Sequence, residues 1–540
     1  MCRLFFSQSY FSYVIINRDL QNVYTVLSYM KTQLLLKAVY NMNFDIKTFT
    51  AKITSVGTAS DTHIETEFRG NEMDLYITAN QDHPRFVELH WDAPKSDDIL
   101  VLGDAWERSY ADLEFKMLIE NDRYMPWYFI ATNHKTSFCF GVKTQPNSFV
   151  SFKYMKDGIT AVVDCRNGGN GVHLEGRKLR LATFVYSEYD SADITGNLRD
   201  YCKKLCDSPI LPKERIYGGN NWYYAYGKSN YKQIISDAKL QVTLAEGIDN
   251  KPFQVIDDCW QPKKCCGPWI PNRKFKDMKK LAEEIKSLGA RPGIWVRLLR
   301  NKDKKIAQEM RILRGGKRQY LDPTHPKAQE YIRADIERIK DWGYELLKHD
   351  FSTADLFGDF GGSLTDTITK VEGWHFYDKT KTNAEIVLDF YRLVLEAAGD
   401  MLIIGCNTVS HMSAGLVHIY RIGDDTSGVE WQRTKDMGVN TLAFRLAQNE
   451  TFYMCDADCV GILKDNIPWE KNRQWLHLLS YSNTPLFVSC TDKITPEQRA
   501  DLQQAYQTFN KPHEFEPVDI FATKTPTQWL IDGQTVKYNW

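Results

Sequence analysis

Hydrophobic and polar residues alternate over short segments in the first part of the chain. Between about residues 44 and 200, segments such as FDIKTFTAKITSV, FVELHWD, SFCFGVK and LRLATFVYSE alternate and are rich in β-branched and aromatic residues, with Gly, Asn and Asp between the segments. A period of two is typical of half-buried strands, and many short strands separated by turn residues indicate an antiparallel β-sandwich. A polar, helix-like segment at 192–205 then leads into SPILP, a predicted linker.

After Lys213 the pattern changes to a repeated order of apolar strand, loop and helix. The predicted strands are IYGGNNW, PFQVIDDCW, ARPGIWVRLL, YELLKHDFS, MLIIGCNT, VHIYRIGDD, TFYMCDADC and PLFVSC. Two of the helical segments between them, RKFKDMKKLAEEIKSLG and PKAQEYIRADIERIKDWG, end in the glycine that favours a helix C-terminus. Eight such units predict an α/β fold, a (β/α)8 TIM barrel.

The pattern divides the chain into four parts. We predict an uncertain N-terminal extension at 1–43, a β-sandwich domain with its linker at 44–212, a catalytic barrel at 213–495, and a C-terminal helix with a short β-like tail at 496–540. The extension lacks the ordered parts of a signal peptide, and Met42 stands just before the first well-patterned segment. We therefore expect a cytoplasmic protein. No run of about 20 apolar residues predicts a membrane span.

Composition and charge exclude some classes of partner. A net charge of -1 without a basic block predicts no binding to nucleic acid or to a membrane surface. The 540 residues exceed what one hydrophobic core usually holds, so more than one domain is expected. Aromatic residues make up 13% of the chain, which slightly favours carbohydrate binding but is also typical of an aromatic core. The 12 cysteines form no CxxC pair and fit no common zinc spacing, so free buried thiols are expected.

Polar residues gather at the C-terminal ends of the predicted barrel strands. In a (β/α)8 barrel this edge carries the active site, so the pattern predicts an enzyme. The residues at these ends are Asn220, Asn221, Trp222, Asp257, Asp258, Arg297, Lys348, Asp350, Asn407, Arg421, Asp424, Asp425, Asp456 and Asp458.

The KHD segment places two charged groups on one face of a strand. Residues at i and i+2 share a face, so Lys348 and Asp350 should point together and His349 should point away. A neighbouring ammonium favours the ionised carboxylate, which suits a nucleophile. A structural ion pair and a Schiff-base lysine, as in barrel aldolases, are the alternatives for this segment.

Two further aspartate pairs add to the predicted site. A retaining glycosidase needs a second carboxyl roughly 5–5.5 Å from the first, and RIGDD offers Asp424 or Asp425, although such a pair is also typical of a helix cap. In IDDCW, Asp257 and Asp258 could accept hydrogen bonds from neighbouring sugar hydroxyls. The alternative is that they hold a divalent metal together with Asp456 or Asp458, but no histidine stands among the strand-end residues.

Taken together, IDDCW, KHD, RIGDD, CDADC and PLFVS resemble, in this order, the melibiase-type retaining α-galactosidases of glycoside hydrolase families 27 and 36. The resemblance covers about 213–495, and the preceding sandwich is similar to that of family 36. It implies that Asp350 is the nucleophile and Asp425 the acid/base, with no cofactor or metal. The implied substrate-binding residues are Trp222, Asp257, Asp258, Trp260, Trp295, Lys348, Asn407 and Arg421.

Some segments depart from the family pattern. The fifth strand reads GCNTVSH, in the region that faces the sugar's 2-substituent in the resembling family, which leaves galactose or N-acetylgalactosamine open as the recognised sugar. KHDFST also lacks the Trp and the Asn-Arg of the common KWDMNR. The expected partner is a galactoside or an oligosaccharide, and the protein could form oligomers. The alternatives are a β-L-arabinopyranosidase, an α-N-acetylgalactosaminidase, a raffinose-synthase-like transglycosidase and, from a different class, a non-catalytic carbohydrate-binding barrel.

Overall fold

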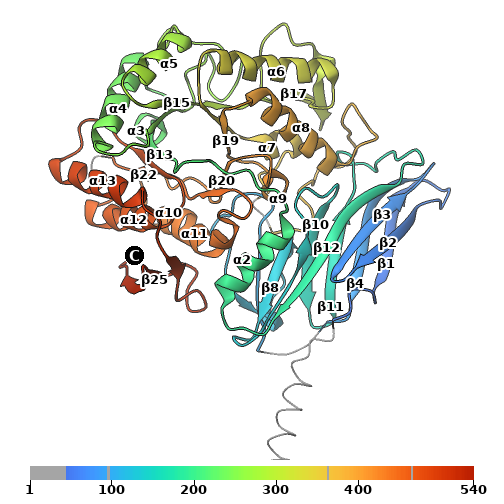
Figure 1. Cartoon of the computed structure of the whole chain (residues 1–540). Coiled ribbons are helices and arrows are strands. Elements are labelled where there is room, and N and C mark those ends of the chain that lie inside the picture. The colour runs from blue at the N-terminus through green and yellow to red at the C-terminus, as the bar shows by residue number, and fades with distance from the viewer. Residues whose placement is uncertain (1–43, 94–97, 362–363, 464–465) are drawn as a thin grey trace, which may run out of the picture.

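The computed structural model describes residues 44–93, 98–361, 364–463 and 466–540. The predicted extension at 1–43, with the expectations about a signal peptide and Met42, lies outside these residues. The described chain is a mixed α/β structure in which antiparallel sheets come first and a curled parallel sheet with surrounding helices follows (Figure 1). No helix within the described ranges is long and apolar enough to span a bilayer.

The alternating segments of the N-terminal part form two antiparallel sheets. The first has, in spatial order, β1 (Thr50–Val56), β4 (His83–Trp91), β11 (Gly158–Asp164), β10 (Phe149–Met155) and β7 (Met125–Pro126). The second has β2 (His63–Arg69), β3 (Glu72–Thr78), β12 (Leu179–Tyr189), β9 (Ser137–Val142), β8 (Tyr128–Thr132), β5 (Leu100–Gly103) and β6 (Lys116–Met117).

Aromatic side chains fill the space between these two sheets. The ring of Trp91 on β4 lies 5.1 Å from that of Phe140 on β9 and 5.8 Å from that of Phe184 on β12. Phe152 on β10 lies 5.2 Å from Phe140, so side chains from both sheets meet. Much of the aromatic content therefore serves as core, where each ring buries a large apolar area.

Strands β8 and β9 are buried along their whole length, unlike the half-exposed β2. Their second face is covered by α2 (Ile194–Leu205) and by the parallel-sheet part of the chain. His411, from that part, stacks 5.2 Å from Trp127, and its Nε2 lies 2.6 Å from the Val142 carbonyl oxygen. Packing on both faces explains why the polar alternation disappears in these strands.

The second part of the chain forms a nine-stranded parallel sheet. Its spatial order is β21 (Met454–Asp456), β20 (Ile419–Arg421), β19 (Leu402–Gly405), β18 (Leu346–His349), β15 (Arg291–Val296), β14 (Phe253–Ile256), β13 (Tyr217–Asn220), β23 (Leu486–Ser489) and β22 (Val460–Gly461). Each of the eight predicted segments contains a strand of this sheet. The two edge strands, β21 and β22, are separated by only residues 457–459 of the chain.

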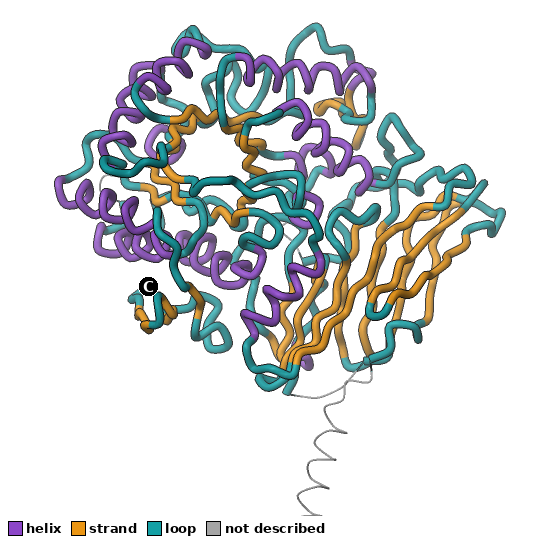
Figure 2. Tube along the Cα trace, in the orientation of Figure 1, coloured by secondary structure: helices purple, strands orange, loops and turns teal. Residues whose placement is uncertain are grey.

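Helices surround the curled sheet on its outside (Figure 2). The two predicted glycine-closed helices are present as α5 (Met278–Ser287) and α6 (Pro326–Asp341), and the glycines that follow, Gly289 and Gly343, have φ of 96° and 89°. Only glycine adopts this left-handed region at low cost. The other long helices are α4 (Tyr231–Leu244), α8 (Asn383–Ala398), α12 (Trp469–Tyr481) and α13 (Pro496–Phe509).

Shorter elements connect these parts. The single turns and short helices are α3 (Trp222–Ala225), α7 (Ser352–Phe357), α9 (Ser410–Ser413), α10 (Trp431–Thr434) and α11 (Asn440–Arg445). A hairpin of β16 (Arg311–Arg314) and β17 (Lys317–Leu321) follows β15. After α13, the predicted β-like tail is a small antiparallel sheet of β24 (Phe515–Pro517), β25 (Gln528–Ile531) and β26 (Gln534–Lys537).

Candidate functional site

A small pocket lies at the carboxyl ends of the parallel strands, the edge at which α/β sheets bind their ligands. Its volume is about 90 Å³. Eight of the ten predicted site residues line it, and Trp260 and Arg421 do not. The lining consists of Arg108, Trp222, Asp257, Asp258, Cys265, Trp295, Lys348, Asp350, Phe351, Cys406, Asn407 and Asp425.

Asp350 follows β18 directly and is held by three hydrogen bonds. Its Oδ2 accepts from the indole N–H of Trp295 at 2.9 Å, its Oδ1 accepts from the Phe351 N–H at 2.7 Å, and its own N–H donates to the Val296 carbonyl at 3.0 Å. Phe351 has φ of 65°, so the chain turns sharply after the carboxylate. Burial raises the pKa of Asp350, although the charge of Lys348 opposes this rise.

Lys348 and Asp350 do not form the ion pair that was the structural alternative for this segment, although the charge of Lys348 favours the ionised form of Asp350, as predicted. Lys348 forms its ion pair with Asp257 on the neighbouring side of the pocket, at 2.7 Å from Nζ to Oδ2. The two-residue period correctly placed Lys348 and Asp350 at one pocket, but a long lysine side chain can reach a carboxylate two strands away. His349 points to the other face, as predicted, and its buried ring lies 5.3 Å from that of Phe390 on α8.

Asp425 lies four residues after Arg421, beyond the end of β20. Its Oδ1 accepts from Arg421 at 3.1 Å, and its side chain is 38% exposed, against 16% for Asp424. Arg421 itself is buried and also pairs with Asp458 at 2.5 Å. Burial acts to raise the pKa of Asp425, but the charges of Arg421 and Arg108 outweigh it and hold the pKa below its ordinary value.

The two aspartates after β14 differ in how many of their oxygens are already engaged. Asp257 accepts from Asn220 at 3.0 Å and from Lys348 at 2.7 Å on Oδ2, and from the Asp258 N–H at 2.9 Å on Oδ1. Asp258 accepts from the Cys259 N–H at 2.7 Å, from Gln261 at 2.6 Å, and from both the N–H and the thiol of Cys265. Asp258 therefore has less capacity left for a ligand hydroxyl than Asp257.

The three predicted tryptophans take different places. Trp222, the first residue of α3, is half-buried on the pocket wall, and Trp295 lines the pocket beside Asp350. Trp260 is fully buried and lies outside the pocket: its indole N–H donates to the Trp295 carbonyl at 2.8 Å, and its ring packs 6.0 Å from that of Trp342. The Trp260 ring therefore turns away from the pocket, toward Trp342 at the end of α6.

Sequence reasoning missed Arg108, Phe351, Cys406 and the role of Cys265. Arg108 comes from the antiparallel sheets, far away in sequence, and no motif marks its segment DAWERSY. Cys265 was visible only as part of a cysteine cluster, whereas the structure places its thiol 3.0 Å from an Asp258 oxygen. Cys406 and Phe351 stood inside quoted motifs but carried no chemical signal of their own.

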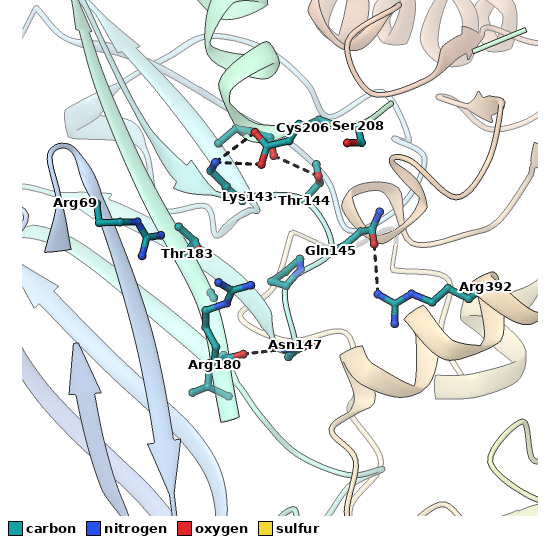
Figure 3. A pocket seen from close by; sticks show the side chains of 15 residues that line it. Arg69, Lys143, Thr144, Gln145, Asn147, Arg180, Thr183, Cys206, Ser208 and Arg392 are labelled. Carbon is teal, nitrogen blue, oxygen red and sulfur yellow. Dashed lines mark hydrogen bonds and ion pairs between the residues drawn. The ribbon is translucent and has the colours of Figure 1, made fainter. Parts of the chain in front are cut away.

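A larger cavity of about 520 Å³ lies elsewhere, where β2, β12 and the residues after β9 face α8 (Figure 3). Its walls carry four cations, but each has a carboxylate partner, and the described lining has one carboxylate, Asp207, and no aromatic ring. The pairs are Arg69–Asp74 at 2.6 Å, Lys143–Asp207 at 3.2 Å, Arg180–Asp74 at 3.9 Å and Arg392–Asp389 at 3.3 Å. This cavity therefore lacks a carboxyl pair for catalysis.

Within the residues that the structure describes, no three His, Cys, Asp or Glu side chains are grouped so as to hold a metal ion. Asp456 and Asp458, which the sequence offered as metal ligands, are engaged otherwise. Asp456 accepts from the Asp458 N–H at 2.9 Å, and Asp458 pairs with Arg421.

Solved structures of α-galactosidases resemble the described fold. The α-galactosidase of Thermus thermophilus, in complex with p-nitrophenyl α-D-galactopyranoside, has a TM-score of 0.60 at 14% identity, over 90% of this chain and 99% of that one. The family 36 enzyme AgaA of Geobacillus stearothermophilus has 0.55 at 12% identity, over 87% and 73%. The Lactobacillus brevis α-galactosidase has 0.53 at 11%, over 90% and 74%. Neither the protein-family models nor the curated proteins include a match. The chain therefore has the fold of α-galactosidases, family 36 enzymes among them.

Proposed function

We propose that the protein is a retaining glycoside hydrolase that releases terminal α-linked galactose. The observation that carries the proposal is that Asp350 and Asp425 line one pocket, because double displacement needs two carboxyls at one sugar. The similar solved structures support the substrate class, because the Thermus enzyme was solved with stachyose and an AgaA variant was solved with raffinose.

In the proposed reaction, Asp350 attacks the anomeric carbon while Asp425 gives its proton to the glycosidic oxygen, which leaves with the aglycone. Asp425, now a carboxylate, then removes a proton from a water molecule that attacks the glycosyl-enzyme. This second step frees the sugar and Asp350. The Trp295 N–H, 2.9 Å from Asp350, would orient the attacking carboxylate. No step requires a cofactor or a metal.

The protonation states have a consequence for this reaction. The productive form has Asp350 ionised and Asp425 protonated, whereas the pocket raises the pKa of Asp350 and lowers that of Asp425. In the reactive form the pair carries one proton, which is on Asp425. Two carboxyls that share one proton still give a bell-shaped pH profile of kcat/KM, whichever of them holds the proton.

The remaining pocket residues would hold the sugar. The Lys348–Asp257 pair offers a donor and an acceptor to neighbouring hydroxyls, and Trp222 offers an apolar wall. Asn407 would lie on the side of the fifth predicted strand, which in the resembling family faces the 2-substituent. Arg421 would act on Asp425 instead of the sugar, because it is buried behind that carboxyl.

We also propose the finer architecture and the domain boundaries. The curled parallel sheet would be a (β/α)8 barrel at 213–495, with β21 and β22 as two halves of its seventh strand, and the antiparallel sheets would be a β-sandwich at 44–212. The hydrogen bonding of β13 to β23, its first and last strands, supports closure. The C-terminal part would be 496–540.

A substrate panel with purified protein tests the function. We expect turnover of p-nitrophenyl α-galactoside, with α-galactose as the first product in NMR, and loss of at least roughly 10³-fold in kcat for Asp350→Ala. Circular dichroism and thermal unfolding control for the fold of the variant. Near-full activity of Asp350→Ala, or β-galactose as the first product, would contradict the mechanism.

The same panel decides among the sugar alternatives. If the β-L-arabinopyranoside or the α-N-acetylgalactosaminide is turned over faster than the α-galactoside, that sugar and not galactose is the one that the pocket recognises. A product that grows when an acceptor sugar is added would indicate transglycosylation. Saturable binding of galactosides without any turnover would indicate the carbohydrate-binding alternative.

A further inference from the structure

Arg108, in the loop between β5 and β6, is the one described lining residue of the pocket that comes from the N-terminal part of the chain. Its guanidinium lies beside both adjacent aspartates: one nitrogen is 2.7 Å from Asp424 Oδ1, and another is 3.8 Å from Asp425 Oδ1. The Arg108 side chain is only 10% exposed. Arg433 holds the other oxygen of Asp424, so that carboxylate is engaged on both sides, whereas Asp425 stays open to the pocket.

The loop that carries Arg108 is fixed to the parallel-sheet part by its backbone. The Ser109 N–H donates to the Ile422 carbonyl at 2.8 Å, and the Asp424 N–H donates to the Ser109 carbonyl at 3.3 Å. Through these bonds Ser109 forms an isolated parallel bridge with Gly423, just after β20. Within the loop, Arg108 Nε donates to the Tyr110 hydroxyl at 3.1 Å, and that hydroxyl donates to Glu107 at 2.8 Å.

The geometry points to Arg108 as a positioning residue for Asp425: it holds Asp424 aside and fixes the segment on which Asp425 faces the substrate. The inference deepens the proposed function and rests on it. A planar guanidinium can span two neighbouring carboxylates in one fixed orientation, which a lysine ammonium cannot do. The N-terminal sheets thus complete the pocket through this side chain.

Arg108 also affects the charge balance of the pocket. It lowers the pKa of both Asp350 and Asp425. Removing its charge should therefore raise both pKa values and move both limbs of the pH profile to higher pH, whichever carboxyl sets each limb. The other charged or titratable groups that face Asp425 are Arg421, Arg433, Lys348, Asp350, Tyr223 and Tyr226.

The test is the pH profile of kcat/KM for Arg108→Met and Arg108→Lys, measured on raffinose and on p-nitrophenyl α-galactoside. For Arg108→Met we expect both limbs to move up by about one pH unit and kcat/KM on raffinose to fall at least roughly 10-fold more than on the aryl galactoside. The reason is that the sugar leaving group of raffinose depends on a well-placed acid. Arg108→Lys should keep the limbs nearer to those of the wild type but lose activity on raffinose.

Arg123→Met is the matched control, since Arg123 lies in the loop before β7 in the same N-terminal part and donates to the carbonyls of Glu114 and Val101 away from the pocket. It should change thermal stability without moving either limb. An Arg108→Met profile that coincides with the wild type, with equal losses on both substrates, would overturn the inference. If Arg108→Met does not fold, an unchanged kcat/KM of Arg108→Lys on raffinose would overturn it. If instead the wild type turns over none of the panel, the proposed function itself fails.

Discussion

Asp424 and Asp425 are identical side chains at neighbouring positions, and only their surroundings distinguish them. Arg108 and Arg433 engage Asp424, whereas Asp425 remains open to the pocket beside Arg421. In the sequence, only the spacing of the resembling family favoured Asp425 over Asp424 as the predicted acid/base. The structure adds a physical difference, because two arginines engage Asp424. The distinction can be measured.

Asp425→Asn should slow the hydrolysis of raffinose by roughly 10²–10⁴-fold, because the amide cannot protonate the departing oxygen. A 2,4-dinitrophenyl α-galactoside, which leaves without a proton, should lose much less in its first step. Steady-state kinetics on both substrates measures the difference. Asp424→Asn makes the same chemical change one residue away and should keep the leaving-group dependence of the wild type; the opposite pattern would assign the acid to Asp424.

Trp295→Phe removes the hydrogen bond to Asp350 while keeping an aromatic ring. A hydrogen bond to a carboxylate favours its ionised form, so the pKa of Asp350 should rise further and the limb that reports it should move to higher pH. With about 1.5–3 kcal/mol for such a bond, kcat/KM should fall roughly 10–100-fold. Trp260→Phe, outside the pocket, serves as the control. A Trp295→Phe profile without any shift would contradict this role.

At the scale of the element, β18 separates two environments. Lys348 points to the pocket edge and Asp257, and His349 points to the rings of Phe390 and Tyr391 on α8. The strand thus delivers polar groups on one face and packs a neutral imidazole on the other. Burial lowers the pKa of His349 to about 3, since no charge or donor compensates the loss of water.

The histidine makes stability depend on pH. Because the pKa of His349 is lower in the folded protein, the unfolded chain binds the proton at a higher pH than the folded protein does. The contribution of His349 to the free energy of unfolding is therefore present above its unfolded pKa of about 6.5 and is lost as the pH falls toward 3. The free energy of unfolding should fall by on the order of 3 kcal/mol from this group between neutral pH and pH 4.

Urea unfolding of the wild type and His349→Gln at several pH values measures this slope. The variant should be less stable at neutral pH but should lose less stability on acidification. His63→Gln, at an exposed strand position, is the control and should keep the wild-type slope. Equal slopes for the wild type and His349→Gln would show that the histidine is not buried in its neutral form.

At the scale of the whole molecule, one buried arginine joins the two sheet systems. Arg445 on α11 pairs with Asp104 at 2.7 Å and donates to the carbonyls of Glu107 at 2.6 Å and Ile422 at 3.1 Å. Both charged side chains are buried. The loop that presents Arg108 to the pocket therefore depends on an ion pair at its base.

Arg445→Met should lower the free energy of unfolding by about 3–5 kcal/mol, because it leaves the Asp104 carboxylate buried without its partner. It should also reduce kcat/KM, since the loop of Arg108 loses its anchor. Arg392→Met, which removes an exposed surface arginine, should change stability by less than about 1 kcal/mol. Similar effects of the two substitutions in denaturant titrations would argue against a linking role for Arg445.

The sequence by itself determined eight strands of the parallel sheet and which residues stand at their carboxyl ends. Apolar runs, the two-residue period and the helix-closing glycines are local signals, and they placed Asp350, Asp425, Asp257 and Trp222 at one edge. The sequence did not determine which side chains meet there. Lys348 reaches Asp257 because its long, flexible side chain extends past β15 to the end of β14, and Trp260 turns into the core because the helices offer it apolar contact. Arg108 was beyond sequence reasoning, since only the packing of one sheet system on the other brings residue 108 beside residue 425.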